Sequence, residues 1–209
     1  MNTRTLLSIA ASAVVINAAG ADVHFQDNFE SGLGQWTGKN SGAHHGVLVI
    51  DPFDQQNTVL SFNRLISAGD LFSSDTLTLD ANESYILSFD YLGLATERTR
   101  QGDTGGYVGF SVDTPGHHSW QWATGTVSGA QDVLIDDGSW HSYEFEFTAA
   151  DLGIGNSVHL MLEDFRGSRG VAGDAYFDNI SFGTASVPAP GGLALVGLGV
   201  LSIARRRRA

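Results

Sequence analysis

The sequence has no cysteine and few basic residues. Without cysteine, the fold cannot depend on disulfide bonds. All 23 acidic residues lie between Asp22 and Asp178, and only six basic residues share that range, so its formal charge is −17. A surface with this charge repels nucleic acid and anionic lipid, and we expect neither as a partner of the body of the protein.

Familiar catalytic motifs are also missing. There is no G-x-S-x-G, no H-E-x-x-H and no glycine-rich phosphate loop. Glu144 and Glu146 have a spacing that the paired carboxylates of glycosidases can adopt, but they alternate with Tyr143, Phe145 and Phe147. Such alternation is typical of a solvated outer strand face. The sequence therefore predicts a protein that is not an enzyme.

The N-terminus has the three parts of a secretory signal peptide. Arg4 supplies the positive charge, Leu6 to Ile16 form a short apolar run, and Ala19-Gly20-Ala21 is a small-residue cleavage pattern. We predict a signal peptide over residues 1–21 and an exported protein that begins near Asp22. A buried N-terminal helix is the alternative.

The body, residues 22–182, is dominated by alternating apolar and polar residues. This pattern predicts half-buried strands separated by glycine-rich turns, and hence a single antiparallel β-sandwich. One helical turn is expected at Ala149 to Leu152. The predicted strands are Val47–Ile50, Thr58–Phe62, Thr76–Leu79, Tyr85–Tyr91, Tyr107–Val112, Val133–Ile135, Tyr143–Phe147, Val158–Leu162 and Tyr176–Phe182.

The C-terminus consists of a linker over residues 183–190, fourteen uncharged residues from Gly191 to Ala204, and an arginine cluster. As a helix, fourteen residues span about 21 Å, which is short for the roughly 30 Å hydrocarbon core of a bilayer. The arginines would hold their end in the cytoplasm. The prolines and arginines concerned are Pro188, Pro190, Arg205, Arg206, Arg207 and Arg208.

This tail resembles the PEP-CTERM sorting domain, also known as an ice-binding protein C-terminal domain, with Ala189 in place of the usual acidic residue. The resemblance implies transient membrane insertion through the C-terminal helix and recognition by an exosortase-type membrane protease. It further implies passage through the inner membrane to the cell surface or extracellular matrix of a Gram-negative bacterium. A simple tail anchor without processing is the alternative.

Three segments of the body resemble carbohydrate-binding modules and galactose-binding-like jelly rolls. They are Asp27 to Trp36, Gly138 to Phe145 and Tyr176 to Phe182. The resemblance implies a non-catalytic sandwich that binds polysaccharide or serves as a matrix component. It also implies that Trp36 and Trp140 belong to the core. An exported glycan hydrolase or lyase is the alternative, and Thr76-Leu77-Thr78 is too short for an ice-binding face.

The same resemblance implies a structural Ca²⁺ where the first and last strands meet. Asp178 shares a predicted strand face with Tyr176, Ile180 and Phe182, and an inward carboxylate needs a partner. Calcium prefers oxygen ligands, and Asp27 and Glu30 could complete the set. Hydrogen bonds from backbone amides, or an arginine such as Arg64, are the alternative.

Exposed aromatic side chains are the expected platform for a sugar. Trp120 and Trp122 are two residues apart, so in a regular strand they share a face, and Tyr107 lies close in sequence. We predict these three as ligand-binding residues. A place in the core is the alternative for the two tryptophans.

Overall fold

The computed structural model describes residues 22–38, 41–63, 68–112, 120–126, 130, 132–165 and 172–185. Asp22–Ala185 form one compact unit. The signal peptide, the linker's Pro188 and Pro190, the apolar tail and Arg205 to Arg208 lie outside the described residues. Within the described part of the chain, no helix is both long and apolar enough to span a membrane.

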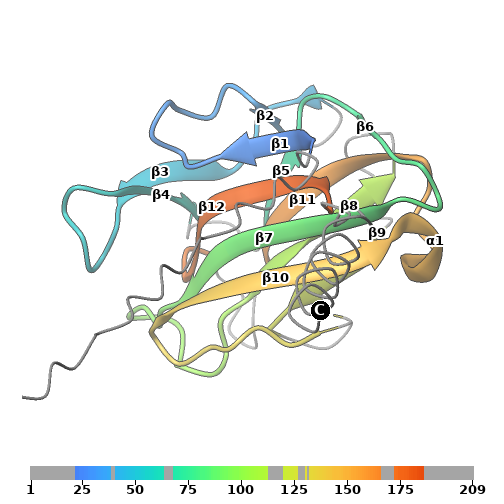
Figure 1. The fold of residues 1–209 in the computed structure, drawn as a ribbon. Coiled ribbons are helices and arrows are strands. Elements are labelled where there is room, and N and C mark those ends of the chain that lie inside the picture. Colours follow the sequence, from blue (N-terminus) through green and yellow to red (C-terminus); the bar gives the residue numbers. More distant parts are fainter. Residues whose placement is uncertain are drawn as a thin grey trace, which may run out of the picture. The chain divides into compact units, whose positions relative to one another are not determined.

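The described body is a sandwich of two antiparallel sheets, as the sequence predicts (Figure 1). Sheet A has the order β10-β7-β12-β4-β3, with β1 also paired to β12. Its strands are β1 (Val23–Asp27), β3 (Gly46–Ile50), β4 (Thr58–Phe62), β7 (Ser84–Gly93), β10 (Trp140–Thr148) and β12 (Ala175–Thr184).

Sheet B has the order β2-β5-β11-β8-β9, and β6 also pairs with β11. Figure 1 shows it behind β7, β10 and β12 of sheet A. Its strands are β2 (Trp36–Thr37), β5 (Ala68–Ser73), β6 (Leu77–Thr78), β8 (Gly106–Val112), β9 (Trp120–Gly125) and β11 (Ser157–Phe165).

The core lies between the inner faces of the two sheets. On β7, Tyr85, Leu87, Phe89 and Tyr91 are buried, whereas the residues between them are half-buried. Phe110 and Phe182 meet edge to face across the sandwich, with ring centroids 5.3 Å apart. Alternation with period two therefore produces one apolar face per strand, and two such faces pack together.

The predicted helical turn forms, whereas one predicted strand does not. Helix α1 spans Ala149–Leu152; the Thr148 side chain accepts a hydrogen bond from the backbone N–H of Asp151, and Gly153 ends the helix at φ 66°. The predicted strand Val133–Ile135 is wrong, because only an isolated bridge between Gly125 and Val133 forms there.

Two β-bulges change which residues share a face. In β12 the register shifts between Asp178 and Ser181, where Asn179 has a φ of 50°. Phe177 and Ile180 are consequently buried in the core, and Asp178 pairs with Asp90 of β7. The prediction that Asp178, Ile180 and Phe182 share one face is wrong, because one extra residue reverses the alternation.

The second bulge lies between β8 and β9. Trp122 pairs with core-facing Phe110, whereas Trp120 pairs with Ser111, the next residue of β8. Successive residues of β8 belong to opposite faces of the sheet. The prediction that Trp120 and Trp122 share a face is therefore wrong.

Candidate functional site

The outer face of sheet A carries a row of apolar residues across three strands. Trp140 of β10 pairs with Leu92 of β7, which pairs with Tyr176 of β12. Leu92 is fully buried, while Trp140 and Tyr176 are each half-buried. Two partly exposed aromatic residues thus flank an apolar centre on the side of the sheet that faces away from the core.

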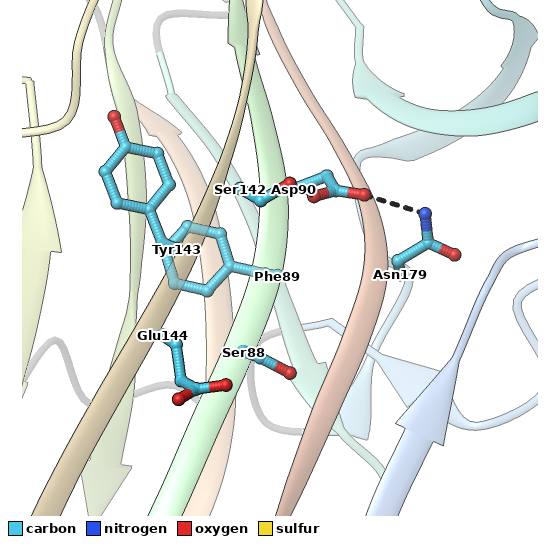
Figure 2. Close-up of a pocket in the computed structure, with 7 residues that line it drawn as sticks. All are labelled: Ser88, Phe89, Asp90, Ser142, Tyr143, Glu144 and Asn179. Carbon is cyan, nitrogen blue, oxygen red and sulfur yellow. Dashed lines mark hydrogen bonds between the residues drawn. The ribbon is translucent and has the colours of Figure 1, made fainter. Parts of the chain in front are cut away.

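The next row on this face is polar and cross-linked. The Asp90 carboxylate accepts a hydrogen bond from the Ser142 hydroxyl at 2.5 Å and another from the Asn179 side-chain amide at 2.8 Å. One side chain of β7 therefore joins β10 to the bulge of β12, as Figure 2 shows for Asp90 and Asn179.

A shallow hollow of about 280 Å³ lies along these strands (Figure 2). Hydroxyl, carboxylate and amide groups from β7, β10 and β12 line it. Phe89 and Tyr143 lie between the polar positions, and their rings stack with centroids 5.4 Å apart. The lining residues are Ser88, Phe89, Asp90, Ser142, Tyr143, Glu144 and Asn179.

The loop between β3 and β4 carries Asp51, which contacts both Trp140 and Phe53. Oδ1 of Asp51 accepts hydrogen bonds from the Trp140 indole N–H (3.2 Å) and from the backbone N–H of Phe53 (2.8 Å). Phe53 is 63% exposed. Burial acts to raise the pKa of Asp51, but the hydrogen bonds from Phe53, Trp140 and Asn57 outweigh it and the net pKa is lowered. Asp51 therefore anchors the Trp140 side chain and the backbone of Phe53.

Asp178 lies beside this anchor. Its Oδ2 accepts a hydrogen bond from the Asn57 amide (2.9 Å), which also donates to Oδ2 of Asp51 (3.3 Å). Burial, together with the charges of Asp90 and Glu30, raises the pKa of Asp178. Asp51 and Asp178 thus share one amide donor beneath the exposed aromatic residues.

The three predicted calcium ligands are only partly brought together. The Thr58 backbone N–H donates to Glu30 at 2.8 Å, next to the Asn57 that contacts Asp178. Asp27 has a different role, because its two oxygens accept the Phe29 backbone N–H (2.8 Å) and the Trp36 indole N–H (2.7 Å). No three His, Asp or Glu side chains of the described residues could hold a metal ion together. These carboxylates fit Ca²⁺ incompletely, and calcium here stays a prediction.

The predicted sugar-binding residues are also divided. Trp122 is 5% exposed and packs in the core against Phe145, with ring centroids 5.6 Å apart. Tyr107 is 1% exposed on the opposite face of sheet B, where burial and the Glu163 charge raise its pKa to about 12. For Trp120, the structure gives the backbone pairing with Ser111 of β8.

The two tryptophans assigned to the core differ. Trp36 is buried and its ring meets Phe25 edge to face, with centroids 4.9 Å apart. Trp140 is half-buried on the outer face, so its assignment to the core is wrong. The sequence contained a usable signal, since Trp140 falls in the alternation of Ser142 and Glu144, which belong to the outer face.

The two glutamates of β10 do not line one common pocket, because Glu144 lines the hollow and Glu146 does not. Glu144 and Glu146 are exposed on the outer face, and Glu146 accepts a hydrogen bond from the Ser84 hydroxyl at 2.9 Å. On β7, Glu144 pairs with Ser88 and Glu146 pairs with Ile86.

Comparison with solved structures finds matches of low sequence identity that cover most of this chain. The CBM22-1 xylan-binding domain of Paenibacillus barcinonensis Xyn10C aligns at 16% identity and a TM-score of 0.49, over 80% of this chain and 97% of that one. The globular domain of T. cruzi calreticulin aligns at 13% identity and a TM-score of 0.49, over 78% and 89%. TmCBM61, solved with β-1,4-galactotriose, aligns at 14% identity and a TM-score of 0.42, over 76% and 94%.

No family model matches the sequence, and no curated protein is significantly similar to it. One sandwich architecture serves many unrelated functions, so function has to be argued from the residues of the site. The resemblance of the tail to a sorting domain likewise stays a prediction.

Proposed function

We propose that this is an exported, surface-sorted protein whose sandwich binds a neutral polysaccharide without cleaving it. The observation that carries the proposal is that one carboxylate oxygen of Asp51 accepts hydrogen bonds from both the Trp140 indole N–H and the Phe53 backbone N–H. Trp140 is half-buried and Phe53 is 63% exposed, and Trp140 lies on the same face of β10 as Ser142 and Glu144, which line the polar hollow.

The chemistry of this face suits a sugar chain. Aromatic rings stack on the apolar faces of sugar rings, and a few fixed polar groups then select the hydroxyl groups. Ser142, Glu144 and Asn179 present such groups in the hollow. Acidic polysaccharides would be repelled by Asp51, Asp90 and Glu144, which favours neutral glycans.

The direct test is affinity electrophoresis of the purified full chain against a panel of neutral and acidic polysaccharides. We expect retardation by at least one neutral glycan. Trp140→Ala and Phe53→Ala should each weaken that binding by roughly tenfold or more, as loss of an aromatic anchor usually does. Trp140→Phe should be intermediate, because it keeps a ring but loses the hydrogen bond to Asp51.

Val133→Ala is the control, since Val133 is 74% exposed and is bridged to β9 of sheet B. It should bind like the wild type. Equal binding by the wild type and all four variants would overturn the assignment of the site. Release of soluble oligosaccharide from the bound glycan would overturn the non-catalytic proposal and favour a hydrolase or lyase.

The destination of the protein is a separate proposal that rests on both termini. A signal peptide over residues 1–21 and a tail ending in Arg205–Arg208 both place the body on the far side of the inner membrane. Intact-mass measurement of the protein from native cells tests this. We expect a chain that begins near Asp22 and lacks the four arginines; retention of the arginines would exclude exosortase processing.

A further inference from the structure

Two buried carboxylates meet between the sheets, away from the outer-face site. Asp164 lies near the end of β11 in sheet B, and Asp174 directly precedes β12 in sheet A. Asp164 is 0% exposed and Asp174 is 1% exposed. Each sheet therefore contributes one carboxylate to the same buried place.

Most of the oxygens of this pair lack a hydrogen-bond donor. Oδ2 of Asp164 accepts the backbone N–H groups of Gly173, Asp174 and Ala175 at 2.5, 3.2 and 3.3 Å. Oδ1 of Asp164 and both oxygens of Asp174 are buried without a hydrogen-bond partner. A buried carboxylate oxygen without a donor is costly, so three in one place require an explanation.

The surroundings make this place more negative. Burial and the charge of Asp174 raise the pKa of Asp164, while burial and the nearby Asp136 raise that of Asp174. The Thr99 hydroxyl, the Gly105 backbone N–H and the Asp164 side chain act to lower the pKa of Asp174, although none of them forms a hydrogen bond of standard geometry with it.

No basic side chain of the described residues compensates the pair. Arg98 and Arg100 are the lysine or arginine residues in those ranges, and both are exposed. Tyr91, whose hydroxyl contacts that of Thr104 at 2.9 Å, stays neutral because burial and the neighbouring carboxylates raise its pKa well above 10. The pair therefore needs a proton or a cation that the described basic side chains do not supply.

We propose that a hard divalent cation such as Ca²⁺ binds between Asp164 and Asp174 and ties the two sheets together at this end of the sandwich. The donor-free oxygens supply carboxylate ligands, and the Thr99 hydroxyl is a further oxygen beside them. Calcium prefers such ligands and accepts irregular geometry. The ion converts repulsion between two buried carboxylates into attraction of both, and its binding couples to folding. This site is distinct from the one predicted at Asp27, Glu30 and Asp178.

The test uses the purified full chain after chelation and compares Asp164→Asn, Asp174→Asn and Asp178→Asn. Calorimetric titration with CaCl₂ should find one site in the wild type that the first two variants lose and Asp178→Asn keeps. At about 100 times the dissociation constant, calcium should raise the Tm of the wild type by roughly 5–10 °C. Without calcium, Asp174→Asn should melt no lower than the wild type, because it removes one of two repelling charges.

Hydrogen exchange of the wild type gives a readout that needs no variant. Chelation should speed exchange of the amides of Gly173, Asp174 and Ala175, which donate to Asp164, and leave the Thr58 amide unchanged. The proposal is overturned if calcium changes neither the Tm nor this exchange, which is the result expected for a pair that shares a proton. It is also overturned if calcium binding is lost in Asp178→Asn and kept in the other two variants.

Discussion

Replacing Asp27 tests whether its carboxylate stabilises the fold or binds a metal ion. In the structure both carboxylate oxygens accept hydrogen bonds from the protein, which a metal ligand would not need. Its side chain is buried, and each oxygen accepts one N–H, from the Phe29 backbone and from the Trp36 indole. In Asp27→Ala both donors stay buried and lose their acceptor. A hydrogen bond to a charged group contributes about 1.5–3 kcal/mol, so the two together predict a loss of roughly 3–6 kcal/mol in the free energy of unfolding.

Urea unfolding of the full chain, followed by circular dichroism, measures this loss. The same decrease is expected in calcium and in chelator, because the donors belong to the protein. Glu97→Ala, at an exposed turn, is the control and should stay within about 0.5 kcal/mol of the wild type. A loss below about 1 kcal/mol, or a loss that appears only in calcium, would refute the structural role and restore Asp27 as a metal ligand.

Three further predictions concern other parts of the fold. Gly106→Ala should destabilise the protein by about 1–3 kcal/mol in the same assay, because its new methyl group would contact the buried Tyr91 ring; unchanged stability would mean that the ring can move. Thr148→Ala should cost about 1 kcal/mol through loss of the cap on α1, with Thr148→Ser restoring most of it. In chelator, the free energy of unfolding should fall as the pH rises above about 4, since the raised pKa values of Asp164 and Asp174 make the folded state bind more protons than the unfolded state. The fall should be smaller in Asp164→Asn, and a wild-type stability that rose over the same range would contradict the sign.

The sequence predicts the sandwich well because strand alternation is a local property. Tyr85, Leu87, Phe89 and Tyr91 needed only their spacing to be assigned to one strand face, and the short helix was expected at Ala149 to Leu152, where α1 forms. The bulges at Asn179 and between β8 and β9 are different, because each depends on the register with a neighbouring strand. Period two fails at such points, and both failures fell on predicted site residues, Asp178 and Trp122.

The candidate site could not be assembled from the sequence for a related reason. Asp51 and Trp140 are 89 residues apart, and Asn57 and Asp178 are 121 residues apart. Their contacts arise only when the β3–β4 loop meets β10 and β12, which no local pattern specifies. The sequence did indicate that Trp140 shares a face with Ser142 and Glu144, but the family resemblance assigned it to the core.

The carboxylates of this acidic body are best distinguished by their hydrogen-bond donors. Asp27 has a protein donor on each oxygen, so it stabilises its surroundings without a ligand. Asp51 and Asp90 also accept hydrogen bonds from protein donors. Asp51 holds the Trp140 side chain and the Phe53 backbone, and Asp90 holds the Asn179 side chain. Asp164 and Asp174 are buried as deeply as Asp27 but keep three oxygens without a donor. Burial alone would group Asp27, Asp51, Asp164 and Asp174 together. Donor counting separates them, because a buried carboxylate that the protein leaves unsatisfied must obtain a proton or a cation from outside.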